Sequence, residues 1–437
     1  MACSSRPLSW HSLDVEFPHA VRALRSRNYR LFAGGQLISL IGTWMQMVAQ
    51  AWLIYRLTGS AVLLGVAGFT AQIPVFVLAP LGGVIADRLD RRRVLIVAQA
   101  VMMLLALILA GLTFSGAVRV WHIYTLAALL GVANAFDIPA RQSFVVEMVG
   151  RESLPNAIAL NSSMFNAARL VGPAVAGAVV AVVGEAWCFL INGLSYSAVI
   201  AALVAMGPSA TVGRTRATVS AWESVVEGFE FAWRTRPVRA LLLLLGLVSL
   251  MGMPYSVLMP IFADRLLGGG PSAYGLLMSA AGSGALAGAG TMTLRRDLRG
   301  LGRWIAFAAS GFGVSLILFS VSRSLLLSAA LLVPVGFFMM IGMAASNTLI
   351  QAMVPDRLRG RVMAVYSMMF MGMAPMGALM AGALAAPVGA PATVAFGGAV
   401  CVVGGIAFGF YLPALRAPAR QLIASQQMSA GASPDEA

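Results

Sequence analysis

Long apolar segments recur along the whole chain and are separated by short polar turns. A membrane-spanning helix needs roughly 20 predominantly apolar residues. Segments of about this length fall at residues 31–55, 62–85, 94–114, 121–138, 157–182 and 187–206, and again at 240–262, 273–294, 304–321, 325–351, 362–385 and 393–413. The pattern therefore predicts an all-α integral membrane protein with twelve transmembrane helices in two six-helix, pseudo-symmetric halves.

The polar segments divide the chain into five parts. These are an N-terminal tail at 1–30, an N-terminal half at 31–206, a linker at 207–239, a C-terminal half at 240–413 and a C-terminal tail at 414–437. Within the linker, Ser220 and Glu223 form an S-x-x-E capping box, which predicts the start of a helix. One face of that helix is apolar and consists of Trp222, Val226, Phe229 and Trp233. We expect it to lie in the plane of the membrane interface, because the alternative, a soluble linker helix, would leave two tryptophans in water.

Composition supports a membrane protein and sets its orientation. Hydrophobic residues make up 59% of the chain and the mean hydropathy is +0.85. All 30 basic residues are arginine, and 25 of them fall in tails and turns that the twelve spans place on one side. By the positive-inside rule, this asymmetry predicts a multi-pass protein of the cytoplasmic (inner) membrane with both termini in the cytoplasm. The net charge of +14 has the same origin and does not indicate a nucleic-acid partner.

Several kinds of chemistry are excluded by residues that the chain lacks. It contains no lysine, so it has neither the lysine of an ATP-binding P-loop nor a Schiff-base amine. Its three cysteines are scattered and its three histidines form no H-E-x-x-H motif, so we expect no metal, no cofactor and no enzymatic activity. No tail is long enough for the soluble signalling domain of a membrane receptor. We expect a small-molecule substrate and the lipid bilayer as partners of a monomer.

The turn between the second and third predicted spans is the most highly charged stretch of the chain. Six of the seven residues from Asp87 to Arg93 are charged, whereas only 11% of the whole chain is charged. The segment beginning at Gly83 follows the pattern G-x-x-[AG]-D-R-x-x-R-R. This pattern resembles the loop between helices 2 and 3 of the major facilitator superfamily, where it acts as a latch on alternating access. The alternative is a basic loop that only sets membrane topology.

Further stretches carry the same resemblance. They are Asn28 to Phe32, Gln36 with Gly42 to Gln46, Pro139 to Gln142, Asn156-Ala157 with Gly172-Pro173, and Leu358 to Val362. Together they resemble the enterobactin-exporter-like and multidrug-efflux-like branch of the superfamily. The resemblance implies the major facilitator fold and a secondary active transporter that exports amphipathic small molecules by alternating access, with proton antiport. A dedicated siderophore or natural-product exporter is the alternative.

The resemblance also implies a role for the charged turn. The latch would consist of Gly83, Asp87, Arg88, Arg91 and Arg92, with Arg359 and Arg361 at the start of the eleventh span. We expect Asp87 to lie beside residues 359–362 when the protein opens outward, because a carboxylate is stabilised at a helix N-terminus.

Two ionisable residues fall within predicted spans, where a charge is costly and therefore indicates function. Asp137 lies near the cytoplasmic end of the fourth span, and Arg169 lies midway along the fifth, on one face with Asn166. One interpretation makes Asp137 and Arg169 a coupled pair whose proton occupancy changes with conformation. The other makes Asp137 a structural partner of Arg91 or Arg92. Glu147 is the next carboxylate to test for coupling.

Polar residues also recur on one face of the first span, at helical spacing. They are Gln36, Ser39, Thr43, Gln46 and Gln50. Lipid cannot satisfy amide side chains, so this face contacts either other helices or a substrate cavity, and we expect the cavity. Met253 and Ser256 form a weaker counterpart on the seventh span. Eleven of the 25 methionines fall between residues 339 and 380, where they form either a yielding wall for apolar substrates or ordinary helix packing.

Overall fold

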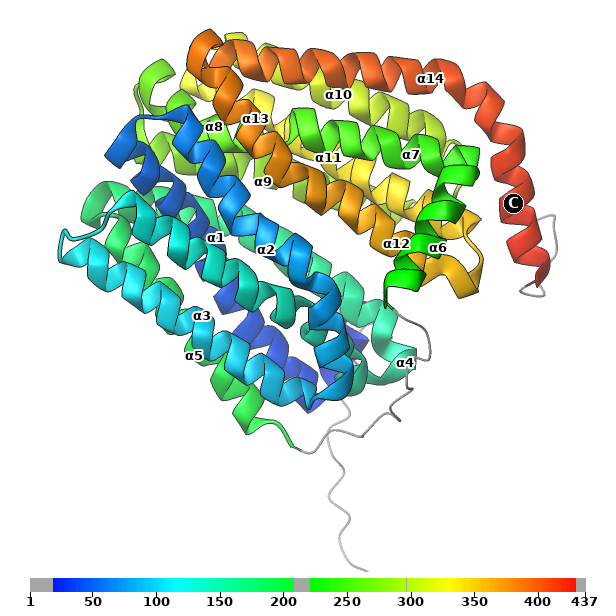
Figure 1. Cartoon of the computed structure of the whole chain (residues 1–437), viewed down its shortest axis with the longest axis horizontal. Coiled ribbons are helices and arrows are strands. Elements are labelled where there is room, and N and C mark those ends of the chain that lie inside the picture. Colours follow the sequence, from blue (N-terminus) through cyan, green and yellow to red (C-terminus); the bar gives the residue numbers. More distant parts are fainter. Residues whose placement is uncertain (1–18, 208–220, 296, 430–437) are drawn as a thin grey trace, which may run out of the picture.

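The computed structural model describes residues 19–207, 221–295 and 297–429. It contains two helical bundles that lie side by side (Figure 1). In the first, a short helix η1 (His19–Arg25) precedes five long ones. These are α1 (Arg27–Thr58), α2 (Ala61–Arg88), α3 (Arg91–Phe114), α4 (Val120–Val183) and α5 (Glu185–Ala205). Helix α4 supplies two spans, because the chain turns at Gly150, whose φ of 71° is left-handed.

The second bundle begins after the linker helix α6 (Ala221–Arg234). Its seventh span combines α7 (Arg236–Leu247), η2 (Val248–Gly252), α8 (Tyr255–Ile261) and η3 (Phe262–Leu266), and α9 (Gly270–Leu294), α10 (Leu301–Val321) and α11 (Leu325–Met353) follow. The eleventh span combines α12 (Asp356–Ser367), η4 (Met368–Gly372) and α13 (Met373–Val388), and α14 (Ala390–Ser429) is the twelfth.

The prediction of an all-α membrane protein in two six-helix halves is confirmed. Within the described ranges, eleven helices are long and apolar enough to cross a membrane. The remaining predicted span, 273–294, is the eighth along the chain and corresponds to α9, whose many glycines and alanines lower its mean hydropathy. Helices α12 and α14 extend beyond the predicted spans, α12 starting at Asp356 and α14 ending at Ser429.

Local sequence explains where the helices begin. The side chain of Ser26 accepts a hydrogen bond from the backbone N–H of Tyr29, Ser60 caps α2 in the same way, and Asp90 caps α3. Helix α1 ends at Gly59, whose φ of 59° lets the chain reverse into α2. These caps set the short α1–α2 and α2–α3 turns that mark opposite ends of the N-terminal half.

Three π-helical turns, η2, η3 and η4, occur in the described part of the C-terminal half, and two of them interrupt a span midway. These two are η2 in the seventh span and η4 in the eleventh, and a π-turn leaves a backbone carbonyl without its usual helical donor. The hydroxyl of Ser249 in η2 donates a hydrogen bond of 2.5 Å to the carbonyl of Phe370 in η4. The two interrupted spans are therefore joined at their irregular turns, inside the C-terminal half.

The halves contact each other along two helix pairs, α4 with α9 and α2 with α13. Glycines allow the close approach: a Cβ at Gly275 would lie 2.5 Å from the carbonyl oxygen of Pro173, and one at Gly382 would lie 2.7 Å from that of Ala61. Small residues at helix interfaces are the usual basis of packing in membranes, where lipid provides no hydrophobic driving force. This seam positions the site described next.

Candidate functional site

The seam between the halves is closed at the end where α1 meets α2, which we call the Tyr55 end. The hydroxyl of Tyr55 donates a hydrogen bond of 2.6 Å to Asp264 in η3. The guanidinium of Arg265 donates one of 3.0 Å to the carbonyl of Gly59 and lies 5.8 Å from the centre of the Tyr55 ring. Trp52 stacks on Tyr274 of α9, with 6.4 Å between ring centres. Polar and aromatic contacts therefore hold α1 against the C-terminal half at this end.

The opposite end, where α2 meets α3, is called the Arg91 end, and there the seam is open. A Cβ at Gly83 of α2 or at Gly290 of α9 would meet no atom within 4 Å. The Cβ at Gly372, in contrast, would lie 2.4 Å from the Phe76 ring of α2, closer to the middle of the seam. Figure 1 shows α2 and α12 diverging toward this end. The two helix pairs are thus packed from the Tyr55 end to mid-span and separate beyond it.

Arg169 lies where the seam stops being packed. A Cβ at Gly282 of α9 would lie 2.7 Å from the Arg169 carbonyl, and the hydroxyl of Ser279 donates a 2.8 Å hydrogen bond to the next carbonyl, Leu170. The Arg169 guanidinium lies 3.7 Å from the sulfur of Met339 on α11 and 5.7 Å from the centre of the Trp44 ring on α1. It also interacts with the hydroxyl of Tyr255 on α8. Arg169 therefore belongs to the N-terminal half but has partners from both halves.

A small apolar cavity of about 30 Å³ lies in the C-terminal half and includes Met339 in its wall. Its other lining residues include Val248, Met253, Phe312, Phe338, Met343, Ser346 and Phe370. The two mid-span π-turns, η2 and η4, border it through Val248 and Phe370. The predicted methionine wall is represented here by Met339 and Met343, whereas Met371 and Met376 are exposed.

The residues of the polar stripe on α1 differ in how deeply they are buried. Gln36, Ser39 and Gln46 are buried, and Thr43 and Gln50 are half-buried. The side chain of Asn192 on α5 donates a 2.6 Å hydrogen bond to Gln46, because Gly42 lets α5 approach so closely that a Cβ there would lie 2.6 Å from Asn192. For Gln46, helix packing replaces the expected cavity position in this conformation, and substrate contact by the rest of the stripe stays a prediction.

Three further residues expected to bind substrate form local hydrogen bonds. The amide of Asn166 donates to the carbonyl of Ser162, the hydroxyl of Thr43 to that of Ser39, and the hydroxyl of Ser256 to that of Met253. Each bond is made within or next to the residue's own helical turn. Of these residues, Met253 lines the apolar cavity.

The expected pair of Asp137 and Arg169 is not formed. Asp137 is 1% exposed, accepts a 2.8 Å hydrogen bond from Gln99 on α3, and lies 3.2 Å from the guanidinium of Arg141, one turn along its own helix. Gln99 and Arg141 therefore compensate the carboxylate inside the N-terminal half. Arg169 follows the break at Gly150 and faces the seam instead, which is why the two residues do not meet.

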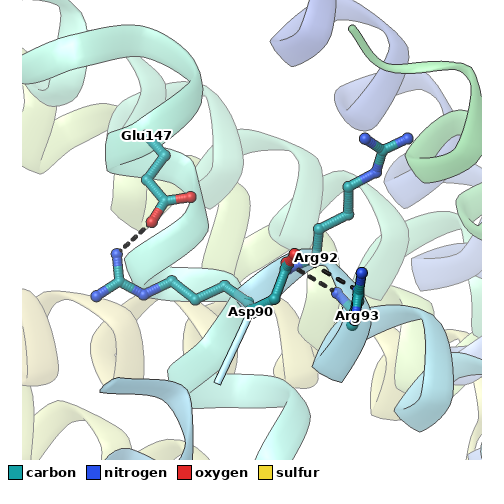
Figure 2. A network of polar contacts seen from close by, with 5 residues as sticks. Asp90, Arg92, Arg93 and Glu147 are labelled. Atoms are coloured by element: carbon teal, nitrogen blue, oxygen red, sulfur yellow. Dashed lines mark hydrogen bonds and ion pairs between the residues drawn. The ribbon is translucent and has the colours of Figure 1, made fainter. Parts of the chain in front are cut away.

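The alternative partners of Asp137 are also engaged elsewhere. Arg91 forms an ion pair of 2.5 Å with Glu147 of α4, and Arg92 donates a 3.0 Å hydrogen bond to the carbonyl of Val204. Asp90 accepts hydrogen bonds from the backbone N–H groups of Arg92 and Arg93 (Figure 2). The charged turn is thus tied to α4 and α5 of its own half.

The contact that the latch prediction requires involves Asp87 of α2 and the start of α12. The side chain of Asp87 lies outside the described part of the chain, Gly83 faces open space and Arg88 is exposed. Arg359 pairs with Asp356 at 2.5 Å, and Arg361 forms an ion pair with Glu227 of the linker helix. Because the expected contact belongs to the opposite conformation, the latch stays a prediction.

Several residues of the site were missed by the sequence analysis. Arg141 was signalled by its spacing, since residues four apart lie on one helix face and oppositely charged pairs stabilise there. Gln99, Asn192 and Tyr255 carried no such signal, because their partners are distant in sequence. Within the described ranges, no group of three or more His, Cys, Asp or Glu side chains could hold a metal ion.

Comparison with known proteins gives a family and several relatives. A family model described as a transmembrane secretion effector matches residues 19–433. The staphyloferrin A transporter of Staphylococcus aureus is 25% identical over 356 residues, which cover 80% of this chain and 88% of the relative. The multidrug efflux pump Tap of Mycolicibacterium fortuitum is 27% identical over 362 residues, with the same two coverages of 80% and 88%.

Solved structures give the same fold. The nucleoside transporter NupG has a TM-score of 0.69 at 12% identity and covers 88% of this chain and 99% of its own. A POT family transporter in complex with 5-aminolevulinic acid has a TM-score of 0.71 at 12% identity, covering 89% of this chain and 97% of its own. At these identities the likeness concerns the fold alone.

Proposed function

Because the chain belongs to the transmembrane secretion effector family of the major facilitator superfamily, we propose that it exports amphipathic small molecules by alternating access, driven by proton antiport. The superfamily assigned from the sequence motifs is confirmed, and the chain is a multi-pass membrane transporter and not an enzyme. Beyond membership of this family, we propose the direction of transport, which is export, the coupling ion, which is the proton, and the substrate class, which is amphipathic small molecules. The proposal also places a monomer in the cytoplasmic membrane with both termini inside.

The observation that carries the proposal is the asymmetric seam. Polar contacts close the Tyr55 end, and packing between the halves ends near Arg169. A transporter of this kind exposes one site alternately to each side by rocking two rigid halves. The arginine-rich turns lie at the Arg91 end, so the positive-inside rule assigns this conformation to an inward-open state that awaits a cytoplasmic substrate.

The relatives support export and a broad substrate class. One is named a staphyloferrin A transporter and another a multidrug efflux pump. Pockets that are mostly apolar with a few placed polar groups bind amphipathic organic molecules, and the cavity beside Met339 and Met253 has this character. The first relative favours the second candidate, a dedicated siderophore exporter, which would have a narrow substrate profile.

Asp137 is the residue to which we assign proton coupling. It is a buried carboxylate held by Gln99 and Arg141 between two helices of the N-terminal half. Protonation would remove its attraction to Arg141 while a hydrogen bond to Gln99 could persist. Protonation would leave Arg141 without its counter-ion and would therefore change how α3 and α4 pack.

Transport and conformation are measured on the full chain in lipid vesicles. Uphill export of several drugs, with substrate-dependent proton movement in the opposite direction, is expected; a siderophore-only profile would establish the second candidate. Spin labels at Ser115 and Ser324 report the Tyr55 end, and labels at Arg93 and Arg357 report the Arg91 end. The two distances should change in opposite directions when substrate or the pH gradient is applied. Distances that stay fixed during transport would contradict alternating access.

A variant tests the seal directly. Tyr55→Phe removes the hydrogen bond to Asp264. The ratio of molecules with the longer Ser115–Ser324 distance to those with the shorter one should then rise about fivefold, for a loss near 1 kcal/mol. Tyr124→Phe is the matched control, because the Tyr124 hydroxyl donates to the Leu63 carbonyl within the N-terminal half. Equal effects of both variants would show that the Tyr55 contact does not control the seam.

A further inference from the structure

Arg169 is a cation in mid-membrane whose charge has no carboxylate partner. Every ion pair among the described residues joins other side chains, and none includes Arg169. The neighbours of its guanidinium are the Trp44 ring, the Met339 sulfur and the Tyr255 hydroxyl. A buried arginine is stable when paired with an anion, and these neutral groups compensate it only in part.

The guanidinium stands at the place where a substrate would arrive. It lies at the last packed level of the seam, marked by the contacts of Gly282 and Ser279 with its own backbone segment, and the helices separate beyond this level. Its planar fork of donors matches carboxylate, sulfonate and phosphate groups. An anion entering from the open side would therefore meet a guanidinium whose present neighbours are all neutral.

Met339 connects this cation to the apolar cavity. Its sulfur lies 3.7 Å from the Arg169 guanidinium, and the same residue lines the small apolar cavity together with Met253, Phe312 and Phe338. Methionine side chains are flexible and adapt to irregular apolar ligands. The charged group and the apolar cavity are thus adjacent, but they belong to different halves of the protein.

We propose that Arg169 and the cavity beside Met339 form one binding site for lipophilic organic anions. The anionic group binds the guanidinium of the N-terminal half, and the apolar body of the same molecule packs against the apolar residues that line the cavity of the C-terminal half. This inference rests on the proposed export function and names the substrate class of that site. Because one ligand contacts both halves, its binding also biases the rocking motion that transport requires.

Two fluorescent probes with the same body separate the charge from the apolar contact. Anilinonaphthalene sulfonate carries a permanent anion, and phenylnaphthylamine is its neutral counterpart. Binding of each to the purified full chain in lipid nanodiscs is measured by fluorescence titration, after subtraction of empty nanodiscs. We expect the wild-type protein to bind the sulfonate at a saturable site with a Kd about tenfold lower than that of the neutral probe, the difference typical of a charge-assisted bond.

The variants test each part of the site. Arg169→Gln should raise the Kd of the sulfonate about tenfold and leave that of the neutral probe unchanged. Arg169→Lys keeps the charge and should lose less. Met339→Ala should weaken both probes, because both use the cavity. Arg323→Gln, in the exposed turn between α10 and α11, removes one positive charge far from the site and should change neither Kd.

An unchanged sulfonate Kd in Arg169→Gln would overturn the proposal, and so would equal losses of both probes. If Arg169→Gln does not fold, as judged by thermal unfolding, Arg169→Lys takes its place. A selective loss of sulfonate binding in Arg169→Lys, seen as a changed ratio of the two Kd values, would then support the proposal, and an unchanged ratio would overturn it. Transport distinguishes this inference from the function it rests on. Uphill export of neutral or cationic compounds without sulfonate binding would contradict only the anion site. Sulfonate binding as expected, without uphill export of any compound, would contradict only the proposed function.

Discussion

Asn192 of α5 donates a 2.6 Å hydrogen bond to Gln46 of α1 inside the N-terminal half. The Asn192 side-chain nitrogen also lies 3.4 Å from the hydroxyl of Tyr196, and the hydroxyl of Ser195 donates a hydrogen bond to the Asn192 side-chain oxygen. Because lipid offers no partner to an amide, such a bond fixes the rotation of one helix against another. The polar face of α1 therefore serves helix packing at this level.

The first prediction follows from this bond. Gln46→Leu leaves the Asn192 amide without its acceptor and should destabilise the protein by roughly 0.6–2 kcal/mol, the range for interhelical hydrogen bonds in membranes. The double variant Gln46→Leu with Asn192→Leu should recover part of that loss, since no buried donor remains unpaired. Unfolding of the full chain in mixed micelles measures both. A double variant that loses the sum of the single losses would show that the bond contributes nothing.

The second prediction concerns Asp137. Asp137→Asn keeps a polar group beside Gln99 but cannot take up a proton or attract Arg141. We expect uphill export to be lost and downhill exchange to continue, measured in vesicles with and without a pH gradient. Glu147→Gln is the control, because Glu147 pairs with Arg91 in the charged turn. Loss of coupling in Glu147→Gln with normal coupling in Asp137→Asn would move the proton site to Glu147.

The fold could be predicted from the sequence, because bilayer crossing imposes a length and a polarity that each span must satisfy. The rule works less directly for α9, where glycine and alanine replace larger apolar residues so that α4 can approach. It also does not give the ends of α14, which continues to Ser429 beyond the apolar segment. Helix length outside the membrane depends on local propensity and contacts with other helices.

The site was harder to predict, because periodicity gives the face of a helix but not its neighbour. The spacing of Gln46 placed it correctly on a polar face, yet only the packing of α1 on α5 decides that Asn192, not substrate, is its partner. For Asp137, the sequence did contain the answer in Arg141, one turn away. The location of both residues in predicted spans instead favours the distant Arg169 as its partner.

The third prediction concerns the linker helix α6. Glu227 forms an ion pair of 3.1 Å with Arg357 and a second ion pair with Arg361. A Cβ at Gly228 would lie 2.7 Å from the Arg361 backbone, so α6 and α12 are closely packed. Glu227→Gln should loosen α6 from α12 and raise amide hydrogen exchange in α6 about two- to fivefold, as expected for exposed ion pairs. Glu230→Gln breaks only the pair with Arg234 within α6. Equal exchange in both variants would show that the ion pairs do not hold α6 in place.

The last prediction uses two glycines of the same helix. Gly275 of α9 faces α4 in the packed part of the seam, where a Cβ would lie 2.5 Å from the Pro173 carbonyl oxygen. Gly290 lies at the open end, where a Cβ would meet nothing within 4 Å. Gly275→Ala must therefore push α4 and α9 apart, at a cost of about 1–3 kcal/mol for overpacking.

That cost falls on the conformation in which the Tyr55 end is closed. The distance between labels at Ser115 and Ser324 should shift toward its longer value in Gly275→Ala. It should stay at the wild-type value in Gly290→Ala, which gains roughly 0.5–1 kcal/mol of helix stability from alanine. A larger effect at Gly290 would mean that the open end closes in most molecules. No effect at Gly275 would mean that the glycine contact does not hold the seam.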